Sequence, residues 1–194
     1  MTPSPTPNFT VRAVLWDMDG TLMDSQPFWD EAFIHHCQAL GGDPRPELVA
    51  QMTGASIRQA RELIAATGAT PSPQDPATAE VFAQMAADVE ASVRVTPPIL
   101  PGARRITSML SEIGLGQVIV TQSPRRIVES VAHALGDVFV GLITGDDGLP
   151  GKPTPAPYAA AIEFLGLRPE ECVAVEDSPT GAAPAPSLIT TSGP

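Results

Sequence analysis

Two aspartates separated by one residue, Asp17 and Asp19, are the side chains of this 194-residue sequence whose types and spacing most readily suggest chemistry. They lie in Asp-Met-Asp-Gly-Thr, directly after Val11–Trp16, an apolar run typical of a buried parallel strand. Gly20 lets the backbone turn and approach a ligand closely. The pattern fits two carboxylates that converge on one small site, and it fits equally a turn that caps the next helix.

Polar residues follow three later apolar runs in the same way. Thr121 and Ser123 come after one run, Lys152 stands in the loop after the next, and Glu176 and Asp177 follow the last. Each group by itself has an ordinary explanation as a helix cap, an exposed loop charge or a turn. Because open α/β sheets bind ligands at the carboxyl ends of their strands, the recurrence at four strand ends indicates one shared site.

Electrostatics indicates what this site binds. Asp17, Asp19 and Asp177, if gathered within ~4–6 Å, would repel one another by roughly 1–4 kcal/mol per pair at a surface-like dielectric. A bound cation would relieve this repulsion, and an all-oxygen set of ligands suits Mg²⁺. Lys152 and the Thr121 hydroxyl would then flank an anion bound beside the metal. These residue types predict a phosphate site.

The elements that position these residues alternate between strand and helix after residue 96, which predicts an α/β fold with a parallel sheet and right-handed crossovers. Between the first strand and this alternation, the sequence indicates helices alone. The predicted strands are Val11–Trp16, Gln117–Thr121, Val138–Ile143 and Cys172–Val175, and the predicted helices are Ser56–Ala66, Ala77–Arg94, Ala103–Ile113, Pro124–Leu135 and Pro155–Leu165, with a further helix from Pro27 to about Gly41. We therefore predict a core of residues 11–24 and 97–194, a helical insertion of residues 25–96, and a flexible tail of residues 1–10.

Composition excludes several classes of protein. The chain has 22 acidic and 11 basic residues, so it lacks the basic balance of a general nucleic-acid binder. It has neither an amino-terminal signal pattern nor an apolar stretch long enough for a membrane span. Cys37 and Cys172 lie far apart and outside any zinc-binding pattern. We expect a soluble, cytoplasmic, monomeric protein with no nucleic-acid or membrane partner.

Four motifs in this order resemble the haloacid dehalogenase superfamily. They are the Asp-x-Asp-Gly-Thr motif, the strand-end Thr121, Gly-Lys-Pro-x-Pro-x-x-Tyr at Gly151–Tyr158, and Val-Glu-Asp-Ser-x-x-Gly at Val175–Gly181. The likeness is closest to the phosphatase and phosphomutase branch, and it extends from Val11 to Gly181, with residues 25–96 matched only in position and helical character. The resemblance implies a Rossmann-like core with helices on both faces of the sheet and a small helical cap inserted after the first strand.

The resemblance also implies catalytic roles. Asp17 would be the nucleophile that forms an aspartyl-phosphate, and Asp19 would protonate the leaving alcohol and then activate water. Thr121 and the backbone amide of Gln122 would bind the phosphoryl oxygens. Lys152 would neutralise the nucleophile and the transferring phosphoryl group.

The same resemblance implies a magnesium site. Asp177 would ligate Mg²⁺ together with Asp17 and the backbone carbonyl of Asp19. Glu176 would act in the first ligand shell or just outside it.

The substrate is less directly indicated. Asp24–Trp29 is similar to a segment of sugar-phosphate phosphatases, and Trp29 stands near the position of a histidine in β-phosphoglucomutases, which favours hydrolysis over isomerisation. Gly54 and Arg58 lie where the family places specificity residues, although an exposed helix charge is the more ordinary role for Arg58. The predicted function is Mg²⁺-dependent hydrolysis of a small phosphorylated metabolite, a sugar phosphate; the alternative is a β-phosphoglucomutase-like mutase.

The carboxyl-terminal residues suggest a hypothesis of another class. After Gly181, the family continues with a helix, a strand and a further helix, whereas here Pro184 and Pro186 disfavour a helix. Ser187–Thr191 alone could form a strand. We therefore expect the last strand and helix of the core to be missing, which would leave an exposed edge strand and an inactive member that only binds phosphate.

Overall fold

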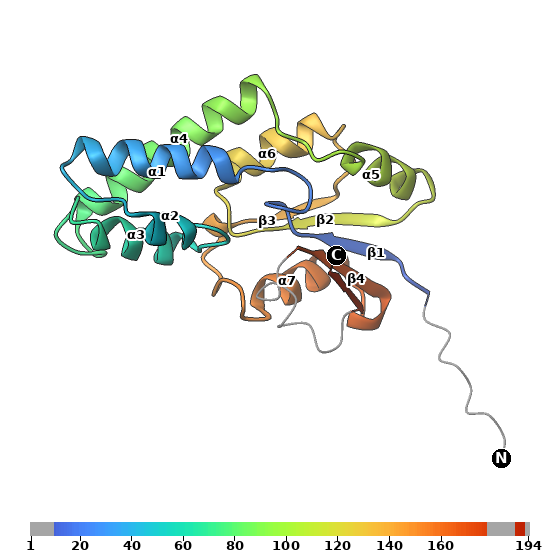
Figure 1. The fold of residues 1–194 in the computed structure, drawn as a ribbon. Helices are drawn as coiled ribbons and strands as arrows, with labels where there is room; N and C mark the ends of the chain where they lie inside the picture. Colours follow the sequence, from blue (N-terminus) through green and yellow to red (C-terminus); the bar gives the residue numbers. More distant parts are fainter. Residues whose placement is uncertain (1–9, 178–188, 193–194) are drawn as a thin grey trace, which may run out of the picture.

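The structure, a computed structural model, describes residues 10–177 and the backbone of 189–192 (Figure 1). Its centre is a five-stranded parallel sheet with the strand order β3-β2-β1-β4-β5. The strands are β1 (Ala13–Trp16), β2 (Gly116–Val120), β3 (Gly141–Ile143), β4 (Cys172–Glu176) and β5 (Ile189–Ser192). In the register, Trp16 lies beside Ile119 of β2 and Val175 of β4, so these three strands end at one edge.

Helices cover both faces of this sheet, as the family resemblance implied (Figure 1). Successive residues of a strand point to opposite faces: Leu15 packs in a cluster with Tyr158 of α7, and Val14 packs in the larger cluster with Ile127 of α6. β1 is buried along its whole length because it is central and covered on both sides. The covering helices are α5 (Ala103–Glu112), α6 (Arg125–Ala134) and α7 (Ala156–Leu165).

Four helices occupy the chain between β1 and α5. They are α1 (Gln26–Ala39), α2 (Pro46–Ala50), α3 (Ile57–Ala66) and α4 (Pro76–Val95). The Ser56 side chain caps α3 in a capping box with Gln59, and α4 packs against α1, α3 and α6. Phe33, Ile64 and Met85 are fully buried in the cluster that this packing forms. The predicted helices of this segment are present, and α2 is an additional short helix.

The edge of the sheet differs from the expectation for the carboxyl terminus. β5 pairs in parallel with β4, with Val173 opposite Ile189 and Glu176 opposite Ser192. The expectation that the last strand is missing is therefore wrong. β5 pairs with the edge of β4 and so provides hydrogen-bond partners for the main-chain groups of β4. The expected absence of a helix falls within residues 178–188, outside the described residues. The predicted flexible tail of residues 1–10 also lies outside them, apart from Thr10.

Two short 3₁₀ helices complete the described elements, Gly145–Asp147 after β3 and Pro169–Glu171 before β4. None of the helices in the described part of the chain is long and apolar enough to cross a membrane.

Candidate active site

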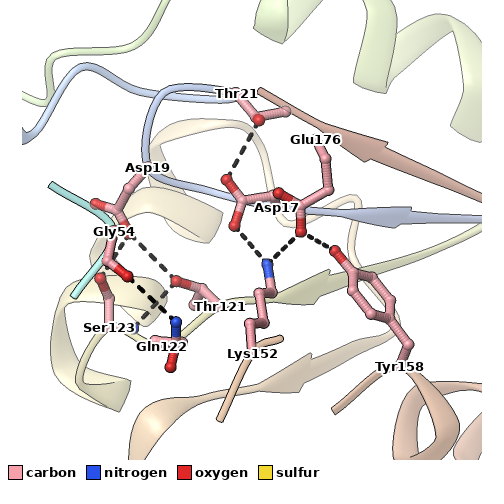
Figure 2. Close-up of polar contacts among 10 residues, drawn as sticks. All are labelled: Asp17, Asp19, Thr21, Gly54, Thr121, Gln122, Ser123, Lys152, Tyr158 and Glu176. Atoms are coloured by element: carbon pink, nitrogen blue, oxygen red, sulfur yellow. Dashed lines mark hydrogen bonds and ion pairs between the residues drawn. The ribbon is translucent and has the colours of Figure 1, made fainter. Parts of the chain in front are cut away.

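Asp17 begins the site because it is the first residue after the central strand β1. Its backbone amide donates to the Val175 carbonyl at 2.9 Å, which fixes the turn to the neighbouring strand. The Asp17 side chain is 11% exposed. One carboxylate oxygen accepts a hydrogen bond from Lys152 Nζ at 2.6 Å, and the other accepts from the Thr21 hydroxyl at 3.3 Å (Figure 2).

Lys152 reaches Asp17 from the loop that follows β3 and is itself buried. Its ammonium group also lies 2.6 Å from Glu176 Oε1, which in turn accepts a hydrogen bond from the Tyr158 hydroxyl (Figure 2). Burial alone would lower the pKa of Lys152, but the charges of Asp17 and Glu176 outweigh burial and raise it. Lys152 therefore stays protonated between two carboxylates.

Three carboxylates are suited to hold a cation here. Asp17, Glu176 and Asp177 each offer an oxygen, and these oxygens all lie within 4.8 Å of one another. Burial raises the pKa of Asp17 well above its usual range, and burial and the Glu176 charge also raise the pKa of Asp177. One ammonium faces three carboxylates, so this oxygen-only donor set fits the charge and ligand preference of Mg²⁺.

Gly20 makes room for this cluster. A Cβ atom built on Gly20 would lie 2.0 Å from Asp177 Oδ2, and its φ of +86° is in the left-handed region that glycine favours. The glycine of the Asp-x-Asp-Gly-Thr motif thus allows the β1 and β4 loops to come together.

Asp19 lies beside Asp17 in a different environment. Its carboxylate accepts hydrogen bonds from three hydroxyls: Ser123 at 2.6 Å, Thr121 at 3.2 Å, and Ser25 at the start of α1. The sequence had indicated Thr121 and Ser123 as strand-end donors. Ser25 was not predicted as a site residue, although it lies in Asp24–Trp29, the segment that resembles sugar-phosphate phosphatases.

Gln122 connects the β2 loop to the helical segment. Its Nε2 donates to the Gly54 carbonyl at 3.3 Å (Figure 2). Its Oε1 is buried and finds no hydrogen-bond partner among the described residues. A Cβ on Gly151 would lie 2.3 Å from that oxygen, so the glycine before Lys152 provides the space for this side chain. The contact brings the predicted residues Gln122 and Gly54 together.

A cavity of about 450 Å³ opens above these groups, which is within the size range of small-molecule sites. It is lined on one side by the strand-end residues and on the other by residues of the four-helix segment. Of the predicted site residues, all except Arg58 line it: Asp17, Asp19, Trp29, Gly54, Thr121, Gln122, Lys152, Glu176 and Asp177.

Arg58 lies outside this cavity. Its side chain is 79% exposed and pairs with Glu62 at 2.8 Å along α3, in keeping with an exposed helix charge. The cavity wall at this end of α3 is instead formed by Ile57 and Gln59.

The arrangement has the parts that phosphoryl transfer requires. Asp17 offers a carboxylate at the floor of a cavity, and Asp19 offers a second carboxylate with hydroxyl partners. Lys152 supplies a positive charge between Asp17 and Glu176. Phosphoryl transfer depends mainly on positioning and on stabilising negative charge.

Comparison with known proteins agrees with this geometry. The family model for haloacid dehalogenase-like hydrolases matches residues 11–187. Hexitol phosphatase B of Escherichia coli K12 is 32% identical over 174 residues, covering 88% of this chain and 77% of the relative. Phosphoglycolate phosphatase of Rhodospirillum rubrum is 28% identical over 180 residues, covering 90% of this chain and 75% of that protein.

The fold has close counterparts among solved structures. CbbY from Rhodobacter sphaeroides, solved in complex with phosphate, superimposes with a TM-score of 0.77 at 24% identity and covers 95% of this chain and 87% of its own. The ordered motifs, the site that they build and the match over residues 11–187 lead to one conclusion: the chain belongs to the haloacid dehalogenase-like hydrolases.

Proposed function

We propose that this chain is a Mg²⁺-dependent phosphatase that hydrolyses a small phosphorylated metabolite, a sugar phosphate, through an aspartyl-phosphate on Asp17. The observation that carries the proposal is the buried ammonium of Lys152, 2.6 Å from both Asp17 and Glu176, at the floor of a cavity that contains a second aspartate. The names of relatives such as hexitol phosphatase and phosphoglycolate phosphatase support a phosphate monoester as the substrate.

In the first step, Asp17 attacks phosphorus, and the bond between phosphorus and the alcohol oxygen breaks. Asp19 gives its proton to the departing alcohol. In the second step, Asp19 takes a proton from water, the water oxygen attacks phosphorus, and the bond to Asp17 breaks to release phosphate. Thr121 and the amide of Gln122 hold the phosphoryl oxygens, and Lys152 balances their negative charge.

Asp17, Asp177 and the Asp19 carbonyl would hold the magnesium ion, with Glu176 beside it. The bound ion would neutralise the phosphoryl oxygens as negative charge shifts onto them. The oxygen-only cluster and the raised pKa values of Asp17 and Asp177 support its placement here.

We propose that residues 25–96 act as a cap over a core of residues 11–24 and 97–194. The cavity supports this division, because Trp29 of α1 and Phe82 of α4 line one side while Asp17, Thr121 and Lys152 line the other. A monomer stays our expectation for the active unit.

The direct test is release of inorganic phosphate from p-nitrophenyl phosphate and from β-glucose 1-phosphate, with Mg²⁺ and with EDTA. We expect turnover that requires Mg²⁺ and is lost in Asp17→Asn. Formation of glucose 6-phosphate without free phosphate would assign the chain to the mutases. Equal rates for the wild type and Asp17→Asn would contradict the proposal, and absence of turnover in both would favour an inactive, phosphate-binding member.

A further inference from the structure

The charges of the cavity are concentrated at one end. Its described lining contains five carboxylates, on Asp17, Asp19, Asp24, Glu176 and Asp177, and one ammonium group, on Lys152. Lys152 is already paired with two of the carboxylates. Among the described lining residues, a positive side-chain charge for a phosphoryl group is therefore available only at the floor of the site.

The helical side of the cavity has no cation of its own. Its lining consists of neutral side chains: Trp29, Gln51, Met52, Thr53, Ala55, Ile57, Gln59, Ala60 and Phe82. Arg58 and Arg61 are adjacent in sequence to this wall, but neither is among the residues that line the cavity. Arg58 faces solvent and pairs with Glu62. Residues 178–194 contain neither lysine nor arginine, so that part of the chain has no side-chain cation to contribute. A second anionic group on a substrate would meet no partner there.

Two aromatic rings form part of this neutral wall. Trp29 and Phe82 stack with ring centroids 6.0 Å apart and an interplanar angle of 14°, and both are partly exposed to the cavity. Such faces pack against the C–H groups of a ligand. Beside them, Gln51, Gln59 and Asp24 supply the amide and carboxylate atoms that hydrogen-bond to hydroxyl groups.

We infer that the cavity selects phosphate monoesters whose alcohol part carries no negative charge and lays an apolar face on the Trp29 and Phe82 rings. This inference rests on the proposed phosphatase function and narrows it. Polyol and sugar monophosphates have an alcohol part of this kind. Esters with a carboxylate and sugar bisphosphates carry a second anion, and burying an unpaired anion beside a surplus of carboxylates is unfavourable.

Two matched pairs of esters test the inference, glucose 6-phosphate against 6-phosphogluconate and glycerol 3-phosphate against 3-phosphoglycerate. Within each pair, the two esters differ mainly at the end away from the phosphate, which is neutral in the first member and a carboxylate in the second. We expect kcat/KM to favour the neutral member by about tenfold or more. Equal or reversed preference, with p-nitrophenyl phosphate still hydrolysed, would overturn the inference and leave the proposed function standing.

Two substitutions locate the effect. Gln51→Lys places a cation in the helical wall and should reduce the preference for the neutral esters several-fold. Gln84→Lys, the same change at an exposed position of α4 outside the cavity, should leave it unchanged. Trp29→Ala should raise KM for glucose 6-phosphate. Trp29→Phe, which keeps an aromatic ring, should raise KM much less.

A binding measurement covers the case in which no ester is hydrolysed. Calorimetry of the four esters on Asp17→Asn with Mg²⁺ should rank the neutral member of each pair as the tighter ligand. If the wild type hydrolysed none of these esters, the proposed function would be contradicted. Tighter binding of the carboxylate esters would contradict the inference itself.

Discussion

Lys152 Nζ lies 2.6 Å from Asp17 Oδ1, although 135 residues separate the two in the chain. The contact joins the loop after β3 to the end of β1, and both residues are more than nine-tenths buried. A buried pair of this kind holds its geometry because either charge alone would be costly in the interior. The pair places Asp17, the nucleophile that we propose, next to Lys152, the cation that would neutralise the negative charge of the phosphoryl group.

Removing this cation should harm both stability and activity. In Lys152→Met, Asp17 and Glu176 lose their shared partner, so we expect a loss of about 3–5 kcal/mol in the free energy of unfolding and no measurable turnover. Chemical denaturation in EDTA measures the first effect, and phosphate release with Mg²⁺ measures the second. Arg58→Met, which removes an exposed cation, is the control; if Lys152→Met were as stable as this control, the pairing would be unimportant to the fold.

Asp19 should be needed for proton transfer. We expect Asp19→Asn to lower kcat by about 10²–10⁴-fold, the usual contribution of a general acid–base group, without a comparable loss of stability, because asparagine keeps an acceptor for the Thr121 and Ser123 hydroxyls. Steady-state kinetics and thermal melting together check this. A variant with normal kcat would exclude Asp19 from the reaction.

Gly20 should be required for the metal cluster. Gly20→Ala brings a Cβ within 2.0 Å of Asp177 Oδ2, so we expect the Mg²⁺ concentration for half-maximal activity to rise at least several-fold. Gly114→Ala separates this effect from backbone strain, because Gly114 has a similar φ of +80° but, its chain neighbours apart, no described atom within 4 Å of the added Cβ. Both variants should lose about 1–2 kcal/mol through the left-handed conformation. An unchanged Mg²⁺ requirement in Gly20→Ala would argue against Asp177 as a ligand.

Asp147 gives a prediction for pH. Burial opposes ionisation of Asp147, but hydrogen bonds from Arg125 and the Thr144 amide outweigh burial and lower its pKa. Because the folded-state pKa is lower than the unfolded one, this contribution to stability is complete above the unfolded pKa of about 4 and is lost as pH falls through the folded value.

Asp147→Asn should therefore be less stable than the wild type at pH 7, and the difference should shrink below about pH 4. Urea denaturation between pH 3 and 7, about the range over which an aspartate titrates, measures it. The exposed Asp43, changed to Asn, is the control. A difference that is constant with pH would show that Asp147 acts through shape rather than charge.

Much of the fold could be predicted because its signals are local. The apolar run before Asp17 and the strand–helix alternation after residue 96 predicted β1, β2, β4 and their helices in nearly the observed positions. α2 was missed because five residues give no periodicity to read. β5 was not expected because its formation depends on pairing with β4, a tertiary contact that the Pro-rich sequence before it does not reveal.

The candidate site divides in the same way. Residue types and order placed Asp17, Asp19, Thr121, Lys152 and Asp177 at one edge of the sheet. The sequence could not reveal which hydrogen-bond partners each of these side chains has in the folded protein.

Three partners were of this kind. The Gln122 contact with Gly54 spans 68 residues of the chain, the Tyr158 hydroxyl reaches Glu176 across 18, and the Ser25 hydroxyl reaches Asp19 across six. Each contact depends on how the folded chain turns, which residue types alone do not specify. The exposure of Arg58 likewise follows from the rotation of α3, which its position in the sequence does not specify.

The covalent step on Asp17 is the central claim, and trapping it is the most direct measurement. The enzyme would be mixed with Mg²⁺ and p-nitrophenyl phosphate, quenched in acid within the first turnover, and analysed by intact mass and peptide mapping. Our account predicts the added mass of one phosphoryl group on the peptide that contains Asp17, and none in Asp17→Asn. Steady turnover with a phosphoryl group on another residue, or an Asp17→Asn protein that is still phosphorylated and active, would contradict it.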